Sequence, residues 1–262
     1  MIQASSFRLA ACALLALLAS CKSDPDKLPP ANPFKPDQQQ NARLEKLAAD
    51  KLYRLARESL DASDFTSAIS KYDQLILRHP FTDYATQGEM ERIYAYFRNY
   101  QAEEATTASD RFLREHPRHP HADYVQYLRG LINASRDQSL FDFIPGVDPS
   151  KGDVTFSRRA FDDFALLLQK YPNSRYDADA RSRMIDLRNR IASSEYSVVD
   201  FYVRRGAWLA AAKRAERIIT DYPGAPATLK AMTLLERCYD ELGLKDQAED
   251  LRKIKAAQKA AT

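Results

Sequence analysis

Three histidines stand within six residues of one another, and they are the strongest candidates for metal ligands in this sequence. His116, His119 and His121 lie in the run Glu-His-Pro-Arg-His-Pro-His. Two prolines stiffen the run, and its spacing matches no standard zinc pattern. We therefore expect a solvated corner between repeats here, and no metal ion.

Two pairs of carboxylates, Asp162-Asp163 and Glu103-Glu104, are the other groups that could do acid–base chemistry. Adjacent residues point to different faces of a helix, so we expect both pairs to be surface charges. His79 precedes Pro80 and is expected to be a corner residue. The sequence contains no nucleophile-elbow serine, metalloprotease helix motif, phosphate loop or dinucleotide fingerprint. We expect no catalytic residues, no cofactor and no enzyme; a hydrolase accessory domain also lacks any residue support.

The elements that carry these residues repeat along the chain. An apolar segment ends four times in a ring residue and a proline: His79-Pro80, His116-Pro117, Tyr171-Pro172 and Tyr222-Pro223. An alanine stands twelve residues before each proline, and a fifth follows Gly243: Ala68, Ala105, Ala160, Ala211 and Ala248. The alanines are 37, 55, 51 and 37 residues apart. The shorter steps are near the period of tetratricopeptide hairpins, about 34 residues.

Each repeated position has a physical reason. The segments 65–78 and 208–220 can be superimposed, with Phe65 on Trp208, and their apolar residues follow a helical period. An alanine permits close approach of two helices, and a proline ends the helix before it. We predict an all-α, tetratricopeptide-like solenoid of about five helical hairpins, or about ten helices, with Trp208 in its core.

Two of the spacings between the repeated alanines, 55 and 51 residues, exceed the tetratricopeptide period. The first contains a turn-rich, partly apolar insertion at 137–155, which either plugs the gap between repeats or contacts a partner. The second contains 175–205 without proline or glycine, which predicts one long helix of roughly 45 Å linking two sub-arrays. We thus divide the array into N-terminal repeats (41–136) and C-terminal repeats (156–260).

The N-terminus resembles a bacterial lipoprotein signal. An apolar run follows Arg8, is too short to span a bilayer, and ends in Leu-Ala-Ser-Cys. We predict a signal peptide (1–20), lipidation of Cys21 and a proline-rich tether (21–40); the alternative is an ordinary signal peptide with an incidental cysteine. Cys238, on an apolar helix face, is expected to be buried. The net charge of +3 does not favour a nucleic-acid partner.

Repeat geometry directs the first helix of each hairpin toward a common groove. Six aromatic and basic residues are expected there: Tyr53, Arg57, Tyr94, Arg98, Tyr124 and Tyr127. Aromatic side chains beside arginines suit a C-terminal peptide with alternating aromatic residues and a carboxylate. The alternative is an aromatic stripe that only packs against the next helix.

Several stretches are more specific than the repeat pattern. They are Ile93-Tyr-Ala-Tyr-Phe, Asp110-Arg-Phe-Leu-Arg-Glu-His-Pro, His119-Pro-His-Ala-Asp-Tyr-Val-Gln-Tyr-Leu-Arg-Gly, Tyr171-Pro-Asn-Ser-Arg-Tyr, Glu195-Tyr-Ser-Val and Tyr202-Val-Arg-Arg-Gly-Ala-Trp. With the lipobox and the tether, they resemble the BamD (ComL) family of lipoproteins of the β-barrel assembly machinery, from about residue 41 to 230.

The resemblance implies a subunit at the periplasmic face of the outer membrane. It would bind unfolded outer-membrane proteins through its N-terminal repeats and BamA through its C-terminal repeats, and other subunits of the machinery would be further partners. Arg214 matches the family's basic contact position for BamA; the alternative is a solvated helix charge. The competing function is a periplasmic repeat scaffold for cell-wall or division proteins.

Overall fold

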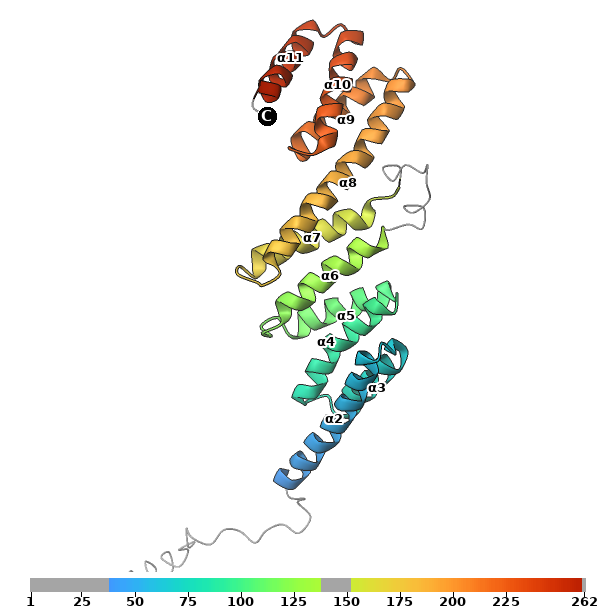
Figure 1. Cartoon of the computed structure of the whole chain (residues 1–262), viewed down its shortest axis with the longest axis vertical. Coiled ribbons are helices and arrows are strands. Elements are labelled where there is room, and N and C mark those ends of the chain that lie inside the picture. The colour runs from blue at the N-terminus through green and yellow to red at the C-terminus, as the bar shows by residue number, and fades with distance from the viewer. Residues whose placement is uncertain (1–37, 138–151, 261–262) are drawn as a thin grey trace, which may run out of the picture. The chain divides into compact units, whose positions relative to one another are not determined.

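The computed structural model describes residues 38–137 and 152–260, and within these ranges the chain is helical with short corners and contains no strand (Figure 1). Ten helices follow one another: α2 (Gln38–Asp61), α3 (Phe65–Arg78), α4 (Asp83–Arg98), α5 (Ala102–Glu115), α6 (Ala122–Arg136), α7 (Thr155–Lys170), α8 (Asp177–Arg204), α9 (Trp208–Asp221), α10 (Pro226–Glu241) and α11 (Lys245–Ala260). The predicted all-α class is confirmed.

The chain divides into two units, and the boundary falls inside α2, between Leu47 and Ala48. In the first unit the described part is the beginning of α2, where Leu44 and Leu47 are exposed. The second unit runs from the rest of α2 to α11 and contains the hairpins described below.

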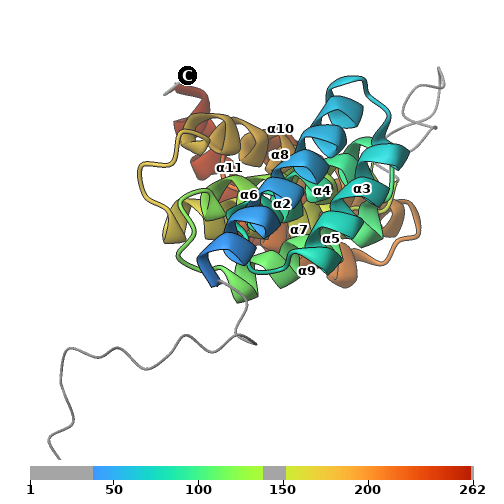
Figure 2. The same ribbon diagram turned by 90° about the horizontal axis from the view of Figure 1, so that it is seen from below.

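From α3 onward, each helix of the second unit packs against the next helix in the chain, and α8 also packs against α10. Figures 1 and 2 both show α6 and α7 side by side. Antiparallel hairpins stacked on their sequence neighbours are the arrangement of a helical solenoid. The predicted hairpin array is therefore confirmed.

The repeated alanines and corners have the structure that their spacing predicts. All five alanines are completely buried: Ala68, Ala105, Ala160, Ala211 and Ala248. At each ring–proline corner, the N–H of the ring residue donates to the carbonyl four residues earlier, as His79 does to Leu75 (2.9 Å) and Tyr222 to Ile218 (3.0 Å). The four corners therefore end their helices in the same way.

The turns inside the hairpins repeat as well. Ser63, Tyr100, Gly206 and Gly243 each follow a helix and have φ angles of 60°, 60°, 71° and 73°. The N–H of each donates to the carbonyl three residues earlier. A left-handed residue at this position is a common way to end a helix, and glycine adopts it most easily. Tyr100 adopts the left-handed conformation without the freedom of glycine, and at 97% exposure it has almost no burial to compensate for the strain.

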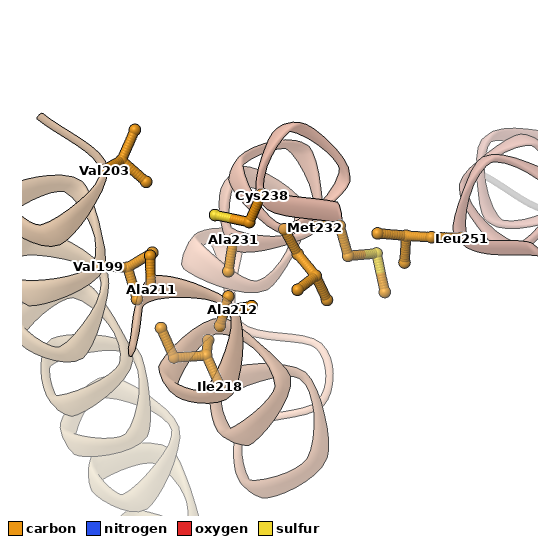
Figure 3. Close-up of a cluster of buried hydrophobic side chains, with 11 residues drawn as sticks. Val199, Val203, Ala211, Ala212, Ile218, Ala231, Met232, Cys238 and Leu251 are labelled. Carbon is orange, nitrogen blue, oxygen red and sulfur yellow. The ribbon is translucent and has the colours of Figure 1, made fainter. Parts of the chain in front are cut away.

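The predicted long helix is α8, whose 28 residues span about 42 Å. Its C-terminal half packs with α9, α10 and α11 around a core in which Cys238 is completely buried, as expected (Figure 3). Trp208 is only partly buried at the edge of this core, with the Arg237 guanidinium 5.3 Å from its ring centre. Trp208 therefore packs against the core as expected but is not completely buried, and it is the first residue of α9.

The predicted signal peptide, Cys21 and most of the tether lie outside the described residues, as does 138–151 of the insertion. Among the described helices, none combines the length and apolar character needed to cross a membrane.

Candidate functional site

A groove of about 560 Å³ is lined by the first helices of three hairpins, α2, α4 and α6, and by the corner before α8. Four of the six residues predicted for such a groove line it: Arg57, Tyr94, Arg98 and Tyr124. His121 and Arg175 also line it, so the groove is rich in basic and aromatic side chains.

A buried carboxylate lines this groove. Glu91 of α4 is 8% exposed, and its Oε1 accepts hydrogen bonds from Tyr53 Oη, Arg57 Nη1 and Gln87 Nε2, each at 2.9 Å. Its Oε2 accepts from Tyr72 Oη at 2.5 Å. These bonds tie α2, α3 and α4 together at one carboxylate. Sequence reasoning missed Glu91, although an acid between the apolar residues of α4 was a visible signal.

The same carboxylate affects two tyrosines. Burial and the hydrogen bond to Glu91 raise the pKa of Tyr53 to about 12, and the same causes raise the pKa of Tyr72. Both hydroxyls therefore stay protonated at neutral pH and donate to Glu91.

The arginines of the groove have different surroundings. Arg57 bonds to two carboxylates, Glu91 through Nη1 and Asp61 through Nε (3.0 Å). Arg98 instead donates to the Tyr94 hydroxyl (2.6 Å), and Arg175 donates to the Tyr176 hydroxyl (2.5 Å). A phenol hydroxyl is neutral, so these contacts leave the charges of Arg98 and Arg175 available to an anionic ligand.

Aromatic rings extend this basic surface. The Arg98 guanidinium lies 5.2 Å from the ring centre of Phe65 and 5.6 Å from that of Tyr94. The ring centre of Tyr124 of α6 lies 5.7 Å from that of Tyr176. Burial raises the pKa of Tyr124 to about 12. The groove thus offers both cations and ring faces.

Two predicted residues do not line this groove. Tyr53 packs at 5.5 Å from Tyr84 and lines a neighbouring cavity of about 560 Å³. Tyr127 is 9% exposed, stacks on Tyr176 at 4.6 Å and donates to Asp179 Oδ2 at 2.5 Å. Tyr127 therefore packs against a neighbouring helix, as the alternative interpretation described, and its contact with a substrate stays a prediction.

Arg214, the predicted partner contact, lies in a separate polar network in the C-terminal repeats. Its Nη1 is 3.3 Å from Glu195 Oε2, and its guanidinium is 5.6 Å from the centre of the Tyr202 ring. The other oxygen of Glu195 accepts from Arg158 (2.6 Å), which also donates to the Tyr222 hydroxyl (2.8 Å). The side chain of Arg214 remains 40% exposed.

The expectation that Asp163 is a surface charge is wrong. Asp163 is 5% exposed, and its carboxylate contacts Arg129 Nη1 (3.1 Å) and Asn133 Nδ2 (2.6 Å). Burial raises the pKa of this carboxyl group. Asp163 lies on the face of α7 that meets α6, which the identity of adjacent residues cannot show. Glu103, in contrast, is exposed and pairs with Arg136.

The histidine corner is less solvated than expected. The rings of His116 and His119 both pack on Phe112, at 4.9 and 5.5 Å. Burial, with smaller contributions from the other two histidines, lowers the pKa of His119. His116 Nε2 lies 3.2 Å from Glu89 Oε2, and Glu115 completes a group whose ligand atoms lie within 4.8 Å of one another. The three histidines do not form one group of possible metal ligands. His116 instead lies near two carboxylates, those of Glu89 and Glu115.

The family model and the sequence relatives agree on one family. The model of the family described as "YfiO: Outer membrane lipoprotein" matches residues 45–254. An "Outer membrane protein assembly factor BamD" from Neisseria meningitidis serogroup A is 38% identical over 79% of this chain and 78% of its own. The protein of the same name from Vibrio cholerae serotype O1 is 34% identical over 92% of this chain and 93% of its own. Among solved structures, the P58(IPK) TPR domain matches with a TM-score of 0.44 and 10% identity over 86% of this chain and 56% of that one.

Proposed function

The chain belongs to the YfiO family of outer membrane lipoproteins, and we propose that it is a non-catalytic assembly factor for outer-membrane proteins. In this proposal it binds unfolded β-barrel substrates through its N-terminal repeats and the BamA periplasmic domains through its C-terminal repeats. The names of its relatives support a role in the assembly of outer-membrane proteins. The groove between α2, α4 and α6 supports a binding site for unfolded substrates in the N-terminal repeats. The same names do not favour a scaffold for cell-wall or division proteins.

The groove carries the proposal because it combines cations with ring faces on three successive first helices. In an extended segment of an unfolded substrate, successive side chains point to opposite sides. Aromatic residues at every second position therefore lie on one side, where they can stack on Tyr94 and Tyr124. A terminal or side-chain carboxylate of the substrate then meets Arg98. Arg57 and Tyr53 act mainly through Glu91, which holds the groove wall. Tyr127 stacks on Tyr176 and does not itself line the groove.

Peptide binding tests this proposal. The probe is a fluorescently labelled ten-residue peptide with alternating aromatic residues and a free C-terminal carboxylate, titrated into the full chain. Arg98→Glu and Tyr124→Ala are expected to weaken binding by about tenfold or more, because 1.4 kcal/mol corresponds to a factor of ten. Compared with the free-acid peptide, a peptide with an amidated C-terminus is expected to bind the wild-type chain more weakly. It should lose no affinity for Arg98→Glu, in which the introduced carboxylate would repel a free C-terminal carboxylate.

A matched control comes from α8. Arg181 is exposed, pairs with Asp177 four residues away and does not line the groove. Arg181→Glu changes the net charge as Arg98→Glu does, so it should leave peptide affinity unchanged. Equal weakening by the two charge reversals would mean that net charge, and not the groove, attracts the peptide.

The second site of the proposal is the surface around Arg214. A half-exposed guanidinium that is already oriented by Glu195 and Tyr202 suits a carboxylate of BamA. The proposed location is the periplasmic face of the outer membrane, with Cys21 as the lipid-modified residue. A lipid anchor would hold both sites near the membrane in which barrels assemble.

A further inference from the structure

We propose that Glu89, Glu115 and His116 form a binding site for a divalent transition-metal cation, with Zn²⁺ as the reference ion. The site is independent of the proposed function. It joins the middle of α4 to the end of α5 and its following residue. The sequence predicts no metal ion at this corner, because the spacing of the three histidines does not suit a shared zinc ion. The two glutamates that approach His116 come from helices α4 and α5.

The distances support coordination. Zinc binds histidine nitrogen and carboxylate oxygen at about 2.0–2.2 Å, so two ligands of a tetrahedral site lie about 3.3 Å apart. His116 Nε2 and Glu89 Oε2 are 3.2 Å apart, near that separation. The third ligand atom, from Glu115, lies within 4.8 Å of the other two. Glu115 is exposed, so its side chain can close the remaining distance by rotation.

The surroundings leave these ligands available. Glu89 contacts His116 through Oε2, and Glu115 contacts Arg111 through Oε1 (2.9 Å). A cation between Glu89 Oε2 and His116 Nε2 would replace their direct contact, and Glu115 has a second oxygen, Oε2, for the cation. The His116 ring is held against Phe112, which fixes the direction of its Nε2. One imidazole and two carboxylates are a donor set that zinc accepts, with water in the fourth position.

A neighbouring cavity reaches the proposed site at His116, and Glu115 is exposed to solvent. The cavity has a volume of about 560 Å³ and is lined by His116, His119 and His121, as well as by Gln87 of α4. Gln87 and His121 also line the groove between α2, α4 and α6. A cation at this corner would therefore cross-link two helices beside the groove, and it would stabilise the folded state through mass action.

The test is calorimetric titration of Zn²⁺ into the full chain, prepared without a polyhistidine tag and treated with a chelator beforehand. We expect one saturable Zn²⁺ per chain. Glu115→Gln, which changes an exposed side chain, should weaken binding by about tenfold or more, and His116→Asn should do the same. Saturating Zn²⁺ should raise the melting temperature of the wild-type chain more than that of either variant.

His121→Asn is the matched control, since His121 lies at the same corner but outside the group. It should keep the wild-type affinity. The proposal is overturned if no saturable binding occurs, if Glu115→Gln and His116→Asn bind as tightly as the wild-type chain, or if His121→Asn loses as much affinity as they do. Because Glu115→Gln is at the surface, its result does not depend on whether His116→Asn folds.

Discussion

Arg214 Nη1 lies 3.3 Å from Glu195 Oε2, across the contact between α9 and α8. The opposite oxygen of Glu195 is held more closely by Arg158, at 2.6 Å. Glu195 would therefore keep a cationic partner if Arg214 turned toward another protein. This relationship makes Arg214 an oriented yet available charge.

Arg214→Glu should weaken association with the BamA periplasmic domains by several kcal/mol, because it would place an acid against the partner's carboxylate. Unfolding should change by about 1 kcal/mol or less, since half-exposed ion pairs contribute little to stability. Binding measurements with circular dichroism check both expectations. Arg217→Glu, an exposed arginine of the same helix paired with Asp221, should bind normally. Equal affinity of Arg214→Glu and the wild-type chain would exclude the contact.

Cys21→Ser should leave a folded chain that no longer fractionates with membranes. The reason is that the lipid supplies the proposed attachment, while the buried core lies in the repeats. Membrane fractionation after a high-salt wash measures the outcome, and circular dichroism provides the folding control. A variant that still sediments with outer membranes would show that Cys21 is not the anchor.

Glu91→Ala should lower the free energy of unfolding by about 1–3 kcal/mol, the cost of leaving a buried hydrogen-bonding group unsatisfied. The change leaves the buried Tyr72 hydroxyl and the Arg57 guanidinium without their shared acceptor. Urea unfolding measures it. Glu58→Ala on the exposed face of α2 is the control and should cost less than about 0.5 kcal/mol. Similar losses for the two variants would contradict the role of Glu91 as a hub.

Gly130→Ala should destabilise the chain by about 1–3 kcal/mol, as overpacking does. A Cβ at Gly130 of α6 would lie 2.5 Å from Phe164 Cε1 of α7. The double variant Gly130→Ala with Phe164→Leu should cost less than the sum of the two single changes, because the smaller side chain makes room. Additive thermal unfolding free energies would show that the two residues do not interact.

Tyr100→Gly should stabilise the chain by about 0.5–1 kcal/mol, because a non-glycine residue in the left-handed region is strained and Tyr100 buries almost nothing. The stabilisation is reduced by the greater freedom of glycine in the unfolded chain. Gly206→Ala, at the equivalent turn, should have the opposite sign. Chemical denaturation compares the pair, and a loss of stability in Tyr100→Gly would reveal contacts that favour tyrosine there.

The sequence by itself determined the features that are local or periodic. Helical spacing predicted the helices, each alanine predicted a close helix contact, and each ring–proline pair predicted a corner. It also placed Cys238 in a core, since one helix face was apolar. These features depend on residues within one or two turns of a helix, which sequence spacing describes directly.

Only the tertiary structure decided which side chains meet. It placed Arg57 on Glu91, 34 residues away, so that a residue predicted to line the groove also holds α2 to α4. It buried Tyr127 against Tyr176 and brought His116 to Glu89, 27 residues away. The physical reason is that these contacts depend on the crossing angles and rotations of packed helices. A shift of a few ångströms exchanges one partner for another without changing the helical pattern of the sequence.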